Sequence, residues 1–175
     1  MNRYMLPMLT LTVAIPCAIA AVAEPAGISA ALRAPEGVQA DFVLQAQGVQ
    51  IYACKPRAND PNAYQWTFVA PEATLTEGGA SVGTHGAGPV WESTSDRSSV
   101  KGAVKQRQDG GAGNIPWLLL AGSTTEGDGK FAGVTSIQRV ATKGGVEPAG
   151  GCDASKAGQE VRVAYTADYY FYKRK

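Results

Sequence analysis

The chain has 175 residues, and its 16 lysines and arginines nearly balance its 15 aspartates and glutamates, which leaves a formal charge of +1. This balance argues against nucleic acid or acidic lipid as a partner, because charge alone would attract neither. Hydrophobic residues make up 45% of the chain and charged residues 18%, a composition that fits one folded domain and excludes a disordered protein.

The N-terminal residues predict a secretory signal peptide over residues 1–23. Arg3 supplies a positive charge, Met5 to Ala20 is a largely apolar run, and Ala21 and Ala23 are the small residues that a signal peptidase requires. We therefore expect a secreted or periplasmic protein with no stable membrane span after cleavage. A retained membrane anchor is the alternative, although the apolar run is near the short limit for a spanning helix.

Cysteine usage predicts one disulfide. Cleavage would remove Cys17 and leave Cys54 and Cys152 as the only cysteines of the exported chain. In an oxidising compartment such a pair is expected to be bridged, and closing a loop of about 100 residues would stabilise the fold by about 4 to 5 kcal/mol. Two free thiols are the alternative. A redox role is not expected, because the chain has no CxxC pair.

Residues 24–37 show no clear period, and we interpret them as a flexible leader before a single all-β domain at residues 38–175. In that domain short β-branched and aromatic runs alternate with glycine, proline, asparagine and aspartate. The expected strands are Phe42–Gln45, Val49–Cys54, Tyr64–Val69, Ser81–His85, Val90–Ser93, Val100–Arg107, Trp117–Ala121, Val134–Ala141 and Val161–Tyr172. They can bury one face by closing into an antiparallel β-barrel or by stacking as a β-sandwich, and both remain open.

The last strand has the clearest pattern, with a period of two residues. One face carries Val161, Val163, Tyr165, Ala167, Tyr169 and Phe171. Asp128-Gly129 is typical of a hairpin turn with positive φ angles before the Val134 strand, and Lys143-Gly144-Gly145 predicts the end of that strand.

His85 is the only histidine, so a zinc site with several histidines is excluded and no metal site is expected. Glu92 and Asp96 are the carboxylates closest to it in sequence, which makes the three weak candidates for acid–base catalysis. No GxSxG, GxxxxGKS or HExxH pattern supports catalysis. Gly127 to Ala132 matches GxGxxA, but the segments around it read as strand and turn, so no cofactor is expected.

The glycine-rich segment 83–89 predicts a tight loop that presents His85 near the mouth of the sheet. In a binding interpretation His85, Trp91 and Trp117 line a ligand pocket. In the structural alternative His85 holds the loop through a backbone hydrogen bond, and the tryptophans are core residues. A sugar-binding platform of exposed tryptophans is less favoured, because Trp66 is expected to face inward with Phe68.

Several segments resemble domain-of-unknown-function family 3455 over residues 38–172. They are GVQIYAC (48–54), YQWTF (64–68), GTHGAGPVWE (83–92), IPWLLL (115–120), GVTSIQRVATKGG (133–145) and YTADYYFY (165–172). Members of that family are secreted bacterial and fungal proteins without an established activity, so the resemblance implies export but no function. Cys54 and Cys152 fall in its motif regions, which agrees with a bridge. Residues 96–99 depart from the Asp-Gly-Ser turn of its relatives.

Taken together, these patterns predict a secreted, non-catalytic module that binds a small molecule, a glycan or a partner in the cell envelope. The alternative is a secreted hydrolase or lyase that uses His85 with Glu92 or Asp96.

Overall fold

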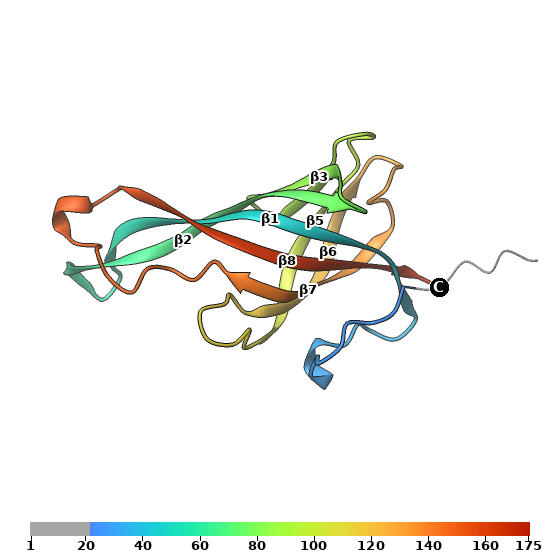
Figure 1. The fold of residues 1–175 in the computed structure, drawn as a ribbon, viewed down its shortest axis with the longest axis horizontal. Coiled ribbons are helices and arrows are strands. Elements are labelled where there is room, and N and C mark those ends of the chain that lie inside the picture. The colour runs from blue at the N-terminus through green and yellow to red at the C-terminus, as the bar shows by residue number, and fades with distance from the viewer. Residues whose placement is uncertain (1–21) are drawn as a thin grey trace, which may run out of the picture.

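The computed structural model describes residues 22–175, so the predicted signal peptide lies outside the described residues except for its last two positions. The eight strands of the described part form one closed antiparallel barrel, in which β8 pairs with β1 (Figure 1). They are β1 (Val38–Arg57), β2 (Asp60–Glu77), β3 (Ala80–Gly86), β4 (Val90–Ser93), β5 (Ser99–Gln108), β6 (Trp117–Glu126), β7 (Val134–Gly144) and β8 (Glu160–Arg174). The all-β prediction is confirmed, with the barrel rather than the sandwich as the architecture.

The first strand is longer than the sequence predicts. The segments Phe42–Gln45 and Val49–Cys54 belong to one continuous strand, β1, and Gly48 lies within it. A Cβ atom at Gly48 would lie 2.1 Å from the backbone oxygen of Glu72 in β2. Glycine is therefore required here by the close approach of two strands and does not mark a turn.

The alternation predicted for the last strand is confirmed by β8. Tyr165, Tyr169 and Phe171 are at most 2% exposed and belong to the hydrophobic core. Phe171 stacks on Phe42 of β1 with 4.7 Å between the ring centroids. Aromatic side chains of the two strands that close the barrel thus fill its interior.

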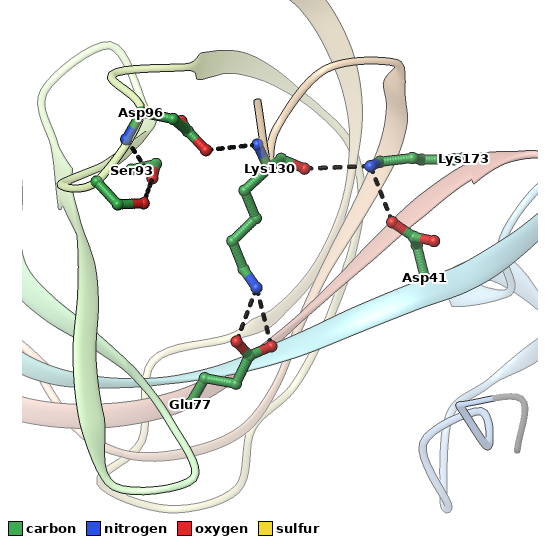
Figure 2. A network of polar contacts seen from close by, with 7 residues as sticks. Asp41, Glu77, Ser93, Asp96, Lys130 and Lys173 are labelled. Carbon is green, nitrogen blue, oxygen red and sulfur yellow. Dashed lines mark hydrogen bonds and ion pairs between the residues drawn. The ribbon is translucent and has the colours of Figure 1, made fainter. Parts of the chain in front are cut away.

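One end of the barrel is closed by the loop at residues 127–133, between β6 and β7. Phe131 at the centre of this loop is fully buried, and its ring centroid lies 5.1 Å from that of Phe171. The backbone nitrogen of Lys130 donates to Asp96, and its ammonium group pairs with Glu77 at 2.8 Å (Figure 2). These contacts hold the loop as a plug.

The expected hairpin turn at Asp128-Gly129 is wrong, because this longer loop takes its place. The positive φ angles occur at Gly127 and Gly133, which begin and end the loop. A Cβ atom at Gly129 would lie 2.1 Å from Cγ of Asp96, so Gly129 is needed for the contact with that carboxylate. The predicted end of the Val134 strand is confirmed, since β7 ends at Gly144.

Part of the predicted leader packs on the outside of the barrel. Ala30–Leu32 forms the 3-10 helix η1, and Leu32 is completely buried. Its carbonyl accepts a hydrogen bond from Gln138 of β7, and the backbone nitrogen of Ser29 donates to Gln108 of β5. This packing places part of the predicted leader against the barrel and buries Gln138 on the outer face of β7.

A disulfide joins Cys54 of β1 to Cys152 in the connection between β7 and β8, so the prediction of a bridge is confirmed and the alternative of two free thiols is wrong. The same connection contains the 3-10 helix η2 (Ala154–Lys156), which lies at the end of the long strands β1, β2 and β8 that is distant from the C-terminus (Figure 1). Within residues 22–175 no helix has the length and apolar character needed to cross a membrane.

Candidate functional site

The end of the barrel opposite the plug holds a cavity of about 680 Å³. This volume lies in the range of roughly 300 to 1,000 Å³ that is common for small-molecule sites. Buried side chains from five strands form its wall: His85 of β3, Trp91 of β4, Leu118 and Leu120 of β6, and Tyr169 of β8 with Gln50 of β1. Eight-stranded barrels are wide enough to enclose one small ligand in this way.

Exposed hydrophobic side chains surround the cavity mouth. Phe68 is 51% exposed, Val69 44%, Val104 40% and Val146 37%, and all four line the cavity. Among the described residues, these four are the large hydrophobic side chains that are exposed. An apolar ring that leads into a cavity is typical of an interaction site rather than of an ordinary protein surface.

A β-bulge shapes one side of this mouth. Ile51 pairs with Ala70 and Tyr52 with Phe68, which leaves Val69 as an extra residue in β2. Bulges bend a strand and redirect its side chains, and they are common at barrel rims. Tyr52 is buried and lines the cavity, so its partner Phe68 faces the same side, as the alternation with Trp66 predicts. Phe68 is nevertheless half exposed because it lies at the mouth.

His85 and Trp91 are partners across β3 and β4, and their rings stack with centroids 4.4 Å apart. The edge of Tyr169 from β8 packs against His85 at 5.1 Å. His85 is 3% exposed, and its Nδ1 lies 2.8 Å from the backbone oxygen of Val90. His85 therefore combines both interpretations of the sequence, because it bonds to the backbone and also lines a cavity.

The protonation state of His85 follows from these contacts. Burial lowers its pKa from 6.5 to about 4, against the opposing effect of the Val90 hydrogen bond, and the positive charge of Arg139 contributes to the lowering. The ring is thus neutral at pH 7. Since a carbonyl only accepts, Nδ1 must carry the hydrogen, and Nε2 is left as an acceptor.

Arg139 of β7 is the half-buried cation of the cavity. Its Nε and Nη2 donate to the backbone oxygen of Pro116, at 3.1 and 2.8 Å, which fixes the orientation of the guanidinium group. It forms no ion pair within residues 22–175. Glu147 is the one carboxylate in the cavity lining, and it is exposed, as is the other lining cation, Arg107.

Further polar groups of the cavity wall lack a hydrogen bond of good geometry. The Nε1 atom of Trp91 is buried with no hydrogen-bond partner among the described residues. The Nε2 atom of Gln50 and the hydroxyl of Tyr169 are also buried and make no hydrogen bond of good geometry there, although Gln50 lies near the hydroxyl of Tyr165, and Tyr169 lies near Tyr165 and Arg139. Burial raises the pKa of Tyr169, so its hydroxyl remains protonated. A buried polar group without a partner costs stability, and such groups in a cavity wall are common where a ligand completes the hydrogen bonds.

The carboxylates nearest to His85 in sequence lie elsewhere in the structure. Glu92 follows the inward-facing Trp91 in β4 and therefore points to the outside of the barrel, where it forms an ion pair with Arg97 at 2.8 Å. Asp96 is exposed in the turn after β4, where it accepts hydrogen bonds from the hydroxyl and the backbone nitrogen of Ser98. These bonds lower the pKa of Asp96 and give it a role in the turn. The structure therefore does not assemble an acid–base pair from these three residues.

The tryptophans are also separated. Trp91 lines the cavity, but Trp117 does not, and its indole lies against Gly27 of the leader. Trp66 is half-buried and donates to the backbone oxygen of Gly150 at 2.9 Å. The three indoles form no common surface in the described part of the chain.

The predictions from sequence did not include Arg139 or Gln50 among the site residues. A usable signal was present for Arg139, because it shares a face of β7 with the buried Ile137 and so places a charge on an inward position. Gln50 gave no comparable signal.

No three histidine, cysteine, aspartate or glutamate side chains within residues 22–175 could hold a metal ion. The GxGxxA match at residues 127–132 lies in the loop that plugs the barrel, between two antiparallel strands. A dinucleotide fingerprint instead requires a strand before the glycines and a helix after them.

Sequence comparison places this barrel in a family. The sequence model of "Protein of unknown function (DUF3455)" matches residues 35–173. The chain belongs to the DUF3455 family. The DUF3455 match spans the barrel strands except their last residue, Arg174, and includes every residue that lines the cavity, and it confirms the resemblance seen in the sequence. Neither the proteins of curated function nor the solved structures include a significant match to the chain.

Proposed function

We propose that this DUF3455 protein is an exported, non-catalytic binding protein that holds a small, mainly apolar molecule inside its barrel. The observation that carries the proposal is the cavity of about 680 Å³, whose mouth collects Phe68, Val69, Val104 and Val146. An apolar ligand would bury these side chains, and each would contribute to binding through its loss of exposed area. A glycan fits this lining less well, because sugars require many polar partners.

Export is the second element of the proposal. The charged and apolar N-terminal residues read as a signal peptide, and the Cys54–Cys152 disulfide is the kind of bond that persists outside the cytosol. N-terminal sequencing of the protein recovered from outside the cytosol should begin at Glu24. A start at Met1 would contradict this element.

The binding proposal can be tested with the neutral fluorophore N-phenyl-1-naphthylamine, whose emission rises in apolar surroundings. We expect the exported protein, with its disulfide intact, to enhance this emission saturably at one site per chain. Val104→Glu places a carboxylate at the mouth and should weaken binding at least about tenfold, because the charge would lose water on ligand entry.

Gln106→Glu is the matched control. It adds the same charge at an exposed position of the same strand, outside the cavity lining, and should change binding by less than about twofold. Equal effects of the two substitutions, or no saturable enhancement by the native protein, would refute binding in the barrel.

A further inference from the structure

The cavity lining has an uneven distribution of charge. Its half-buried cation is Arg139, and its one carboxylate, Glu147, lies exposed and unpaired with it among the described residues. Two guanidinium N–H groups of Arg139 bond to Pro116, and an arginine side chain has five. The other donors make no hydrogen bond of good geometry within residues 22–175, although the guanidinium group lies near the hydroxyl of Tyr169, so they can bond to a bound molecule in an orientation that the protein already holds.

The neighbours of Arg139 are also rich in donors. Across the β7–β8 ladder it pairs with Tyr169, whose buried hydroxyl lies near the guanidinium group and near Tyr165 but makes no hydrogen bond of good geometry with either. The indole nitrogen of Trp91 is buried in the wall without a partner, and the amide nitrogen of Gln50 is buried there near the hydroxyl of Tyr165 without a hydrogen bond of good geometry. Several donors and a positive charge in mainly apolar surroundings call for a ligand group that only accepts hydrogen bonds and carries negative charge.

Resting on the proposed function, we propose that the barrel ligand is a monocarboxylic acid with an apolar body, whose carboxylate is bound by Arg139. The planar guanidinium group matches the two oxygens of a carboxylate, and the apolar body would occupy the space between the stacked His85–Trp91 pair and the exposed hydrophobic mouth. The low dielectric of the cavity strengthens the attraction between the opposite charges.

Competition against bound N-phenyl-1-naphthylamine at pH 7 tests this ligand class with two probes of equal chain length, decanoate and 1-decanol. We expect decanoate to displace the fluorophore at a concentration at least about tenfold lower than 1-decanol, because hydrogen bonds to a charged group exceed those to a neutral one. Arg139→Met keeps an apolar stem without the charge. It should retain binding of the neutral fluorophore and reduce the preference for the acid to less than about twofold.

Two further arginine variants make the test specific. Arg139→Lys keeps the charge but loses the planar pair of donors, so it should retain part of the preference. Arg57→Met removes one charge from an exposed position outside the cavity and should leave the preference as in the native protein. If Arg139→Met does not fold, the ratio of the two probes on the native protein still decides the ligand class.

The possible results separate the two proposals. Binding of the fluorophore with equal displacement by decanoate and 1-decanol would overturn the acid preference and leave the barrel-binding proposal intact. A preference for decanoate that Arg107→Met removes, while Arg139→Met does not, would place the carboxylate at the mouth and overturn the assignment to Arg139. If the native protein does not bind the fluorophore, both proposals fail.

Discussion

Because the chain has a single histidine, the dependence of its stability on pH near neutrality can be assigned to one side chain. His85 is neutral and buried in the folded protein, where burial lowers its pKa to about 4, whereas the unfolded chain should have the ordinary value of 6.5. Between these two values the unfolded state binds a proton that the folded state does not. The free energy of unfolding must therefore fall as the pH falls from about 6.5 towards 4.

The magnitude follows from the two pKa values. Their separation corresponds to about 3 kcal/mol in total, of which about 2 kcal/mol falls between pH 7 and pH 5. Aspartate and glutamate side chains of the unfolded chain titrate mostly below this interval. Because the chain has one histidine, the loss in this interval belongs mainly to His85.

Urea unfolding of the disulfide-bonded protein at pH 7 and pH 5, followed by tryptophan fluorescence, measures this loss. His85→Gln removes the titrating ring and should abolish most of the difference. Asp168→Asn is a second control. Burial raises the pKa of Asp168, so its protonation favours the folded state as the pH falls and opposes the effect of His85. Without this carboxylate the loss of stability between pH 7 and pH 5 should be at least as large as in the native protein. A change below about 0.5 kcal/mol in the native protein would mean that the folded state does not hold His85 neutral, and the reasoning would be refuted.

Three further predictions concern packing, the disulfide and buried hydroxyls, and urea unfolding at pH 7 measures each. Gly48→Ala should destabilise the fold by about 3 kcal/mol, because its new Cβ would meet the backbone of Glu72 in a contact that no side-chain rotation can relieve. Reducing the disulfide should lower the free energy of unfolding by about 4 to 5 kcal/mol in the chain-entropy treatment. Tyr52→Phe should cost about 1 kcal/mol, because that hydroxyl donates a 2.6 Å hydrogen bond to Gly145. Tyr165→Phe should cost less, because its buried hydroxyl lies near Tyr169 and Gln50 but makes no hydrogen bond of good geometry with either.

Each of these has an outcome that contradicts it. Gly86→Ala is the control for Gly48→Ala, since a Cβ atom at Gly86 would meet nothing within 4 Å, and equal losses would refute the contact argument. A reduced protein as stable as the oxidised one would show that the bridge does not stabilise this fold. Equal costs for the two tyrosine variants would show that the hydroxyl of Tyr165 does find a partner in solution.

Features that depend on neighbouring residues in the chain could be predicted from the sequence, whereas features that depend on contacts between distant segments could not. The period of two residues in β8 correctly assigned Tyr165, Tyr169 and Phe171 to the buried face, because side-chain alternation is a local property of any strand. The same reasoning correctly placed Phe68 on the inner face, but it did not show that this residue lies at the open end of the barrel, where it is 51% exposed. The bulge next to it, at Val69, arises from pairing with β1, and no pattern within β2 indicates it.

The glycines show the same division. Gly144, at the end of β7, has a positive φ and fits the prediction from local sequence. Gly48 and Gly129 are required because another segment lies too close for a Cβ atom, at Glu72 and Asp96 respectively. Neither contact can be predicted from neighbouring residues. The sequence analysis therefore did not place Gly48 within a strand, and it assigned Gly129 to a tight hairpin turn that the structure does not contain.

What the amino-acid sequence determined by itself was the all-β class, the pair of cysteines available for the bridge, and the alternation of inward and outward residues in the strongest strand. These properties depend on residue type and on neighbours along the chain. The closed barrel, the plug around Phe131 and the placement of His85 and Arg139 in the wall of one cavity were decided only by the tertiary structure. Each depends on which distant strands pair and in what register, and closing β8 onto β1 turns separate inward-facing residues into the wall of one cavity.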